Sequence, residues 1–203
     1  MSISVQDRER ISNAVRAAEE RSSGEIVCVL AKTSSDATAL PVLIAAVVAL
    51  ALPWLLVVFT AMTVQRILSL QLALFLVLLV LLCMPRVRVA LMPRKARRAI
   101  AYRAAMEQFT TRGISRKKDR CGILIFVSLA ERYARIIADD GIAARVSQSE
   151  WQAAIDALVA HVREDRIADG FVAAIELCGS KLAKHFPRTD TKLGELPDRI
   201  YLI

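Results

Sequence analysis

The chain has 203 residues, a length that fits one domain with a core of ordinary size. Apolar residues make up 55% of the sequence and the formal net charge is +8. An apolar share this high excludes an ordinary soluble composition. Both the apolar excess and the positive charge are local, as the order of segments along the chain shows.

The first 38 residues are polar, so we do not expect them to contain a cleaved signal peptide. We expect an amphipathic helix over residues 4–22, opened by a capping box of Ser4 and Asp7. Its apolar side carries Ile11, Val15 and Ala18. The segment "EIVCVLAK" (25–32) follows, and its β-branched residues and short length predict a strand.

Two long stretches without a charged residue come next, one on either side of Arg66. A helix rises about 1.5 Å per residue, so roughly 20 residues cross a hydrocarbon core near 30 Å. The stretches therefore predict transmembrane helices over about residues 39–64 and 67–85. The alternative is a pair of buried helices in a soluble bundle, which adjacent uncharged runs of this length disfavour. A two-span hairpin places both of its flanks on the same side of the membrane.

The segment from Arg86 to Arg120 is strongly basic, with twelve Lys/Arg and two acids. Basic residues near membrane ends stay on the cytoplasmic side, so we expect a multi-pass protein of the cell inner membrane with both termini in the cytoplasm. These charges either contact the anionic headgroups of the lipid bilayer or only set the topology. The residues expected to face lipid are Arg86, Arg88, Arg94, Lys95, Arg97 and Arg98. Nucleic acid is not an expected partner, because the charges are juxtamembrane and no aromatic platform alternates with them.

Beyond the spans, helical and strand patterns alternate. A helix is predicted over residues 94–113, then strands over Gly122–Leu129 and Tyr133–Ala138, whose short connection predicts an antiparallel hairpin. Two helices follow, the first opened by a capping box of Ser147 and Glu150. The apolar stripes of the three helices are Ala99, Tyr102, Met106 and Phe109; Trp151, Ile155, Leu158 and Val162; and Phe171, Ile175, Cys178 and Leu182. The tail "IYLI" either pairs as an edge strand or docks on the core.

The soluble strands are too few on either side of the spans to fold separately, since an isolated hairpin is marginal in water. We therefore expect one α/β domain: a small mixed β-sheet flanked by helices and interrupted by a two-helix transmembrane hairpin. Residues 1–38 supply its first helix and strand, residues 39–85 the hairpin, and residues 86–203 the basic juxtamembrane helix and the remainder of the domain.

Several stretches of the chain resemble the TPM domain family, named for its thylakoid, phosphatase and membrane-associated members. They are "SSGEIVCVLAK" (22–32), "CGILIFVSLAERYARIIADDGIAARV" (121–146), Trp151, "DGFVAAIELCGSKLA" (169–183) and "ELPDRIYLI" (195–203). The last of these is similar to the ending of a bacterial membrane subgroup with the same inserted hairpin. The resemblance implies a small sheet flanked by helices.

The resemblance also implies two kinds of activity. Some members of the family are acid phosphatases or divalent-metal binders, and others act in the assembly or repair of membrane complexes. Where the family places Asp-Asn-Gly, this chain has Arg120-Cys121-Gly122. Where the family has a Gly-x-Gly turn, this chain has Asp139-Asp140-Gly141.

An acidic cluster is the candidate metal site. In an antiparallel hairpin the start of one strand lies beside the end of the next, so we expect Asp119 to come close to Asp139 and Asp140. Three carboxylates at one sheet edge can hold Ca²⁺ or Mg²⁺, and such an ion can polarise a phosphate ester. The alternative is that the three are turn and cap residues on a wet edge, with Arg120 neutralising one of them.

Other catalytic parts are few. The two histidines are His161, beside the apolar stripe of its helix, and His185, at a helix carboxyl end where an imidazolium suits the dipole. Cys121, next to Arg120, is either an activated thiol or a buried inert cysteine. The sequence lacks the Cys-x-x-Cys, His-Glu-x-x-His, Walker and Gly-x-Ser-x-Gly motifs, which excludes the common zinc, nucleotide and serine-hydrolase sites.

The expected function is a membrane-anchored interaction or assembly module at the cytoplasmic face, whose partner is a membrane protein or a second copy of the chain. The alternative is a divalent-metal-dependent acid phosphatase acting through Asp119, Asp139 and Asp140. Ca²⁺ or Mg²⁺ is the cofactor only in the second case. The first function is preferred because Arg120 stands in the family's carboxylate-led motif and no general base is evident.

Overall fold

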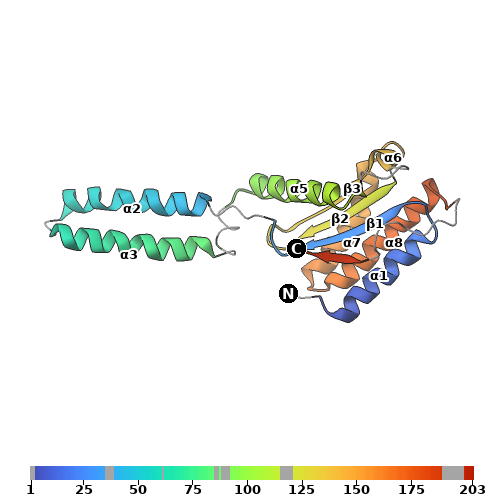
Figure 1. Cartoon of the computed structure of the whole chain (residues 1–203), viewed down its shortest axis with the longest axis horizontal. Helices are drawn as coiled ribbons and strands as arrows, with labels where there is room; N and C mark the ends of the chain where they lie inside the picture. The colour runs from blue at the N-terminus through green and yellow to red at the C-terminus, as the bar shows by residue number, and fades with distance from the viewer. Residues whose placement is uncertain are drawn as a thin grey trace. The chain divides into compact units, whose positions relative to one another are not determined.

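The computed structural model describes residues 3–34, 39–60, 62–84, 87, 92–114, 121–188 and 199–203. The chain divides into two compact units: Met1–Ser34 with Ala99–Ile203, which we call the head, and Ser35–Arg98. The elements (Figure 1) are α1 (Val5–Glu19), β1 (Glu25–Ala31), α2 (Ala39–Phe59), α3 (Val64–Cys83), α5 (Arg94–Thr111), β2 (Gly122–Ser128), β3 (Tyr133–Ala138), α6 (Asp140–Ala143), the 3-10 helix η2 (Gln148–Trp151), α7 (Gln152–Arg163), α8 (Ile167–His185) and β4 (Ile200–Leu202).

The head contains a mixed four-stranded sheet in the order β3-β2-β1-β4. β1 is parallel to both β2 and β4, and β2 is antiparallel to β3. Every residue of β1 and β2 is buried, which is why the two strands read as continuous apolar runs instead of alternating patterns. Parallel neighbours need a long crossover connection, and between β1 and β2 the chain uses that connection to hold α2, α3 and α5.

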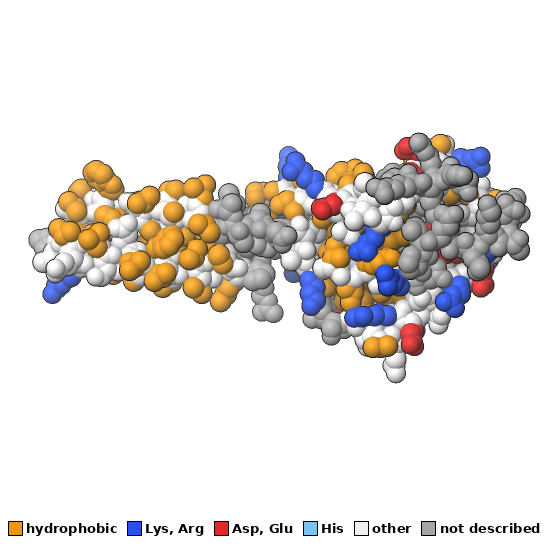
Figure 2. All heavy atoms as spheres, in the orientation of Figure 1, with side chains coloured by type: hydrophobic (Ala, Val, Ile, Leu, Met, Phe, Trp, Pro, Cys, Tyr) orange, Lys and Arg blue, Asp and Glu red, His pale blue; other side chains and the backbone are white. Residues whose placement is uncertain are grey.

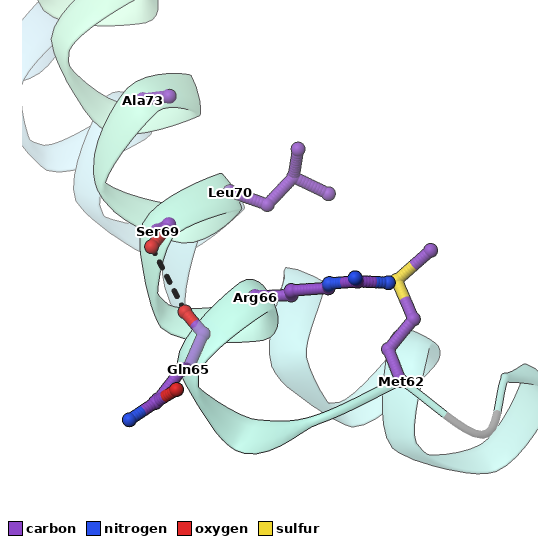
Figure 3. A pocket seen from close by; sticks show the side chains of 6 residues that line it. All are labelled: Met62, Gln65, Arg66, Ser69, Leu70 and Ala73. Atoms are coloured by element: carbon purple, nitrogen blue, oxygen red, sulfur yellow. Dashed lines mark hydrogen bonds between the residues drawn. The ribbon is translucent and has the colours of Figure 1, made fainter.

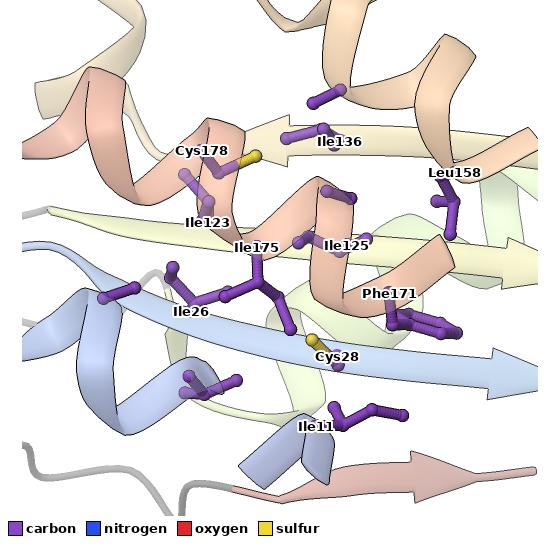
Figure 4. Close-up of a cluster of buried hydrophobic side chains, with 14 of the residues drawn as sticks. Ile11, Ile26, Cys28, Ile123, Ile125, Ile136, Leu158, Phe171, Ile175 and Cys178 are labelled. Carbon is purple, nitrogen blue, oxygen red and sulfur yellow. The ribbon is translucent and has the colours of Figure 1, made fainter. Parts of the chain in front are cut away.

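Helices cover both faces of this sheet (Figure 1). On one face, α1, α7 and α8 enclose the larger core, which Figure 4 shows around Cys28, Ile125, Phe171 and Ile175. On the other face, Ala105 and Phe109 of α5 pack with side chains of β1, β2 and β3. The fold is therefore α/β with one sheet between two helical layers, as the sequence predicts.

Several local predictions are confirmed in the head. Ser4 and Asp7 form the expected capping box of α1, and Ser147 and Glu150 form another, which opens η2 instead of α7 itself. The predicted apolar stripes of α1 and α8 are buried: Ile11, Val15, Ala18, Phe171, Ile175, Cys178 and Leu182. These stripes follow the 3.6-residue period of a helix with one face on a core.

The tail settles an alternative that the sequence left open, and α5 corrects one of the predictions from the sequence. The tail forms β4, an edge strand in which Ile200 and Tyr201 pair with Cys28 and Val29 of β1. In α5 the predicted stripe of Ala99, Tyr102, Met106 and Phe109 is wrong except for Phe109. The helix buries Ala101, Ala105 and Phe109, because small side chains let it approach the sheet closely. Tyr102 and Met106 are 40% and 36% exposed.

The second unit contains α2 and α3, which pack against each other and which we call the apolar hairpin. α2 is shorter than its predicted span because it ends at Phe59, and α3 begins earlier than predicted, at Val64, so Arg66 lies in its first turn rather than in the connection. The buried residues of α2 include Ala45 and Ala49, which lie one helical turn apart. Small residues at this spacing allow two helices to approach closely.

Candidate functional site

The acidic end of the sheet is where β2 begins and β3 ends. The backbone N–H of Asp139 donates to the carbonyl of Gly122 at 2.9 Å, so the end of β3 lies beside the start of β2, as an antiparallel hairpin requires. Asp139 is the N-cap of α6, and its Oδ1 accepts the N–H of Asp140 at 2.8 Å. The carboxylate is buried, and its Oδ2 has no hydrogen-bond partner among the described residues.

A second buried carboxylate, Glu25, lies at the same end of the sheet, and sequence reasoning missed it. Glu25 opens β1 and pairs in register with Gly122, so Gly122 is flanked by Glu25 on one strand and Asp139 on the other. Ile114 fills the space over Gly122, where an added Cβ would lie 2.3 Å from its Cγ2. The signal in the sequence was a lone glutamate directly before an apolar strand.

The predicted metal cluster is only partly within the described chain. Asp119 lies outside the described residues, as does Arg120, while Asp139 and Asp140 are adjacent at the start of α6. Within the described residues there is no group of three or more His, Cys, Asp or Glu side chains that could hold a metal ion. The three-carboxylate site therefore stays a prediction.

One histidine and two cysteines of the head are placed as structural residues. The Nδ1 of His161 lies 2.8 Å from the carbonyl of Ala157, one turn earlier in α7. Cys28 and Cys178 are fully buried in the larger core, and burial raises the pKa of Cys178 to about 12 and that of Cys28 further. Cys121 is half-buried. Protonated core thiols are poor nucleophiles, so Cys28 and Cys178 offer no thiol chemistry.

The opposite end of the sheet holds a third buried carboxylate, that of Glu131 in the turn between β2 and β3. Its Oε1 accepts the hydroxyl of Thr33 at 3.2 Å, and its Oε2 accepts the N–H of Ser34 at 3.0 Å. The Ser128 hydroxyl donates to the same Oε2 and accepts from the Ser34 hydroxyl at 2.8 Å. Glu131 therefore connects the turn between β2 and β3 to Thr33 and Ser34. These two residues follow β1 and lead along the chain to α2.

The apolar hairpin turns large apolar side chains outward. Trp54 and Phe59 are 79% and 78% exposed, and Figure 2 shows apolar side chains over the visible face of both helices. The described residues contain two helices long and apolar enough to cross a membrane, α2 from Val42 onward and α3 over its full length. Exposure distinguishes them from the core helices of a soluble protein, which are mostly buried.

A hollow of about 470 Å³ lies at the end of the apolar hairpin where α2 connects to α3 (Figure 3). It is lined by Met62, Gln65, Arg66, Ser69, Leu70 and Ala73. The Ser69 hydroxyl is already used, because it donates to the carbonyl of Gln65 at 2.9 Å. One cation, one amide and an engaged hydroxyl without a carboxylate do not make an acid–base site.

The predicted lipid-facing residues are placed in part. Arg86 and Arg88 lie outside the described residues, whereas Arg94, Lys95 and Arg98 are exposed on α5 and Arg97 is half-buried. Tyr102 and Met106, which sequence reasoning assigned to the core, lie on the exposed side of the same helix. The structure thus adds two apolar side chains to the solvent-facing side of a basic helix.

Comparison with known proteins gives the family. Residues 84–181 match the model of the TPM domain, a stretch that runs from the end of α3 into α8. No curated protein matches the chain. The chain is similar to a solved structure described as "NMR structure of BA42 protein from the psychrophilic bacteria Bizionia argentinensis sp. nov.", with a TM-score of 0.63 and 21% identity over 100% of this chain and 96% of that one. At this identity the likeness concerns the fold alone. The family model places a TPM domain over residues 84–181, and by this match the chain contains a TPM domain.

Proposed function

We propose that this TPM domain protein is a membrane-anchored interaction module. The apolar hairpin spans the bilayer, and the head binds or stabilises a membrane protein, or a second copy of the chain, at the cytoplasmic face. The observation that carries the proposal is the outward display of large apolar side chains along α2 and α3. Each such side chain left in water costs about 1.5–3 kcal/mol relative to burial, so the hairpin needs an apolar surrounding.

The charge distribution supports the cytoplasmic orientation. Arg66 is the single charged residue between Ala37 and Pro85, whereas twelve Lys/Arg follow within residues 86–120. Basic residues are retained on the cytoplasmic side of a membrane. The head therefore remains in the cytoplasm, and the connection between α2 and α3 reaches the opposite surface.

The anchoring test is extraction of cell membranes that contain the full chain. We expect the protein to remain in the pellet after an alkaline carbonate wash and to be released by detergent. Recovery in the supernatant after the wash, without detergent, would overturn the proposal.

Cysteine labelling in intact cells tests the orientation. Met62→Cys, in the connection between α2 and α3, should react with an impermeant maleimide from outside the cell. Val5→Cys, at an exposed position of α1, should react only after lysis. The reverse pattern would contradict the cytoplasmic placement of the head.

The interaction role is tested on the detergent-solubilised chain. Crosslinking in native membranes followed by size analysis should give a discrete species larger than the 22.4 kDa chain. Its mass and composition distinguish a second copy from another membrane protein. A chain that stays monomeric before and after crosslinking would count against the interaction module.

A metal-dependent phosphatase is the second candidate, favoured by one observation: the buried Oδ2 of Asp139 without a hydrogen-bond partner in the described chain. A hard divalent cation prefers such carboxylate oxygens. Asp139 and Asp140, with Asp119 from outside the described residues, would hold Ca²⁺ or Mg²⁺, and the ion would supply polarisation of a phosphate ester when bound. Arg120, in place of the family's carboxylate-led motif, remains the reason to rank this function second.

Thermal unfolding with and without Ca²⁺ or Mg²⁺ separates the two functions, because a ligand that binds only the folded state raises Tm. The phosphatase requires a metal-dependent rise in Tm and turnover of a phosphomonoester, both lost in Asp139→Asn. The matched control is Asp156→Asn, at an exposed position of α7. The interaction module predicts no metal-dependent turnover in any of the three proteins.

A further inference from the structure

Helix α5 has a buried side and a solvent-facing side that both carry apolar residues. The buried side packs on the sheet through Ala101, Ala105 and Phe109. Tyr102 and Met106 lie one turn apart at the solvent-facing margin of that side and are 40% and 36% exposed. A tyrosine and a methionine in adjacent turns of a helix surface form an apolar patch that no described residue covers completely.

The charges around this patch are basic. Arg98 and Arg103 lie on α5 next to Tyr102 and are exposed, and the guanidinium of Arg135 on β3 lies 5.0 Å from the centre of the Tyr102 ring. We call Arg98, Tyr102, Arg103 and Met106 the α5 ridge.

The opposite face of the head differs in charge. Helix α5 carries five basic residues and one acid, whereas α1, α7 and α8 together carry six basic and six acidic residues. Four of the five basic residues of α5 lie at or before Arg98 and the fifth is Arg103, so the positive charge of this helix is gathered toward the end that follows the apolar hairpin in the sequence.

The chain also limits how far the ridge can lie from a membrane. Ten residues separate Cys83, at the end of α3, from Arg94, at the start of α5. Fully extended, such a segment reaches at most about 40 Å. If α3 ends at the bilayer surface, the start of α5 therefore lies within about 40 Å of that surface.

We propose that the α5 ridge rests in the headgroup region of an anionic bilayer, with Tyr102 and Met106 entering the interface and Arg98 and Arg103 contacting lipid phosphates. This inference rests on the membrane anchoring proposed above and adds which face of the head the lipid contacts. Tyrosine is enriched at membrane interfaces, and helices with apolar and basic residues on one surface bind anionic lipids. The face formed by α1, α7 and α8 is then left free for a protein partner.

The test uses the full chain in lipid nanodiscs and a fluorophore at one position. Thr110 and Ser180 offer a matched pair, because each is an exposed hydroxyl on a helix that donates to the carbonyl four residues earlier. Thr110→Cys reports from the last turn of α5, and Ser180→Cys reports from α8. Cys83→Ser and Cys121→Ser remove the accessible thiols, while the buried Cys28 and Cys178 remain.

A lipid with a spin label on its headgroup quenches fluorophores that lie close to the surface. In discs containing phosphatidylglycerol we expect quenching at position 110 at least threefold stronger than at position 180. The difference should fall in Arg98→Gln/Arg103→Gln and in Tyr102→Ser/Met106→Ser. It should persist in Arg8→Gln/Arg163→Gln, which removes two exposed cations from α1 and α7.

The outcomes separate this inference from the anchoring on which it rests. Equal quenching at positions 110 and 180 in a chain that is stably inserted would overturn the ridge contact and leave the anchoring intact. Undiminished quenching at position 110 in discs of phosphatidylcholine alone would overturn the role of anionic headgroups. A chain that fails to insert into any disc would overturn both proposals.

Discussion

The guanidinium of Arg112 lies over the ring of Tyr201, with its central carbon 3.6 Å from the ring centre. Arg112 follows the last residue of α5, and Tyr201 is the middle residue of β4. The contact therefore joins the helix on one face of the sheet to the short edge strand at the end of the chain. It adds to the pairing of β4 with β1 and to the burial of Ile200 in the larger core.

A double-mutant cycle should measure this contact. Arg112→Gln and Tyr201→Leu should each lower the free energy of unfolding, with a coupling of about 0.5–1 kcal/mol, the range for a cation over an exposed aromatic ring. Arg199 provides the comparison, since its guanidinium lies over the same ring at 4.9 Å. Urea unfolding of the four variants gives the coupling, and a value for Arg199 equal to or above that for Arg112 would contradict the geometry.

Gly122 is predicted to be intolerant of any side chain. A Cβ there would lie 2.3 Å from the Cγ2 of Ile114, a fully buried residue. We expect Gly122→Ala to cost about 1–3 kcal/mol through overpacking. Ile114→Ala alone should cost about 2–5 kcal/mol through the cavity it leaves.

The pair should be strongly non-additive. In Gly122→Ala/Ile114→Ala the new methyl group enters the space that the isoleucine vacates. The double variant should therefore lose less free energy of unfolding than the sum of the losses of the two single variants. Gly113→Ala is the control: it has a φ of +73° and nothing within contact distance of the added Cβ. Its cost, which comes from the backbone alone, should be unaffected by Ile114→Ala.

Glu131 is predicted to be the most sensitive polar residue of the β2–β3 turn. Glu131→Gln keeps the shape but turns an amide N–H₂ toward the donors from Thr33, Ser34 and Ser128. A buried polar group without its partner costs about 1–3 kcal/mol, and we expect a loss of that size. Glu9→Gln, at an exposed position of α1, should change stability by less than about 0.5 kcal/mol. A similar loss in both variants would show that the network contributes nothing.

The sequence was sufficient where one physical rule decided the outcome. The stripe of α8 was predicted because its helix packs a single apolar face on the core. The antiparallel pairing of β2 with β3 was predicted because their connection is short enough for a hairpin. In α5 two overlapping stripes compete, and hydrophobicity alone favours the larger residues Tyr102 and Met106. Close approach to the sheet favoured alanines instead.

Long-range pairing was the part that the sequence could not supply. β1 and β2 are neighbours although 90 residues separate them, and no local pattern specifies that partner. For the same reason Glu25 was missed, since its place beside Gly122 depends on the register of two strands distant in sequence. The tail "IYLI" is compatible with either edge pairing or core docking, and only its alignment with β1 decides.

The two core thiols give a prediction for reactivity and for pH. In the folded chain, iodoacetamide at pH 8 should modify the half-buried Cys121 and leave Cys28 and Cys178 intact. Raising the pH to 10 should not make Cys178 reactive, because burial raises the pKa of its thiol to about 12. Modification of Cys178 at the rate of Cys121 under native conditions would contradict the packed core.

The same pKa shift makes alkaline pH destabilising. An unfolded cysteine ionises near pH 9.0, whereas folded Cys178 stays protonated up to about pH 12. Between these values the folded state binds more protons than the unfolded state, so stability is fully present below pH 9 and falls as the pH rises above it. Urea unfolding at pH 8 and pH 10 should therefore show a larger decrease in the native chain than in Cys178→Ala. Other groups titrate in both proteins, so their contribution cancels when the two decreases are compared. Equal decreases would show that Cys178 ionises as readily in the core as in the unfolded chain.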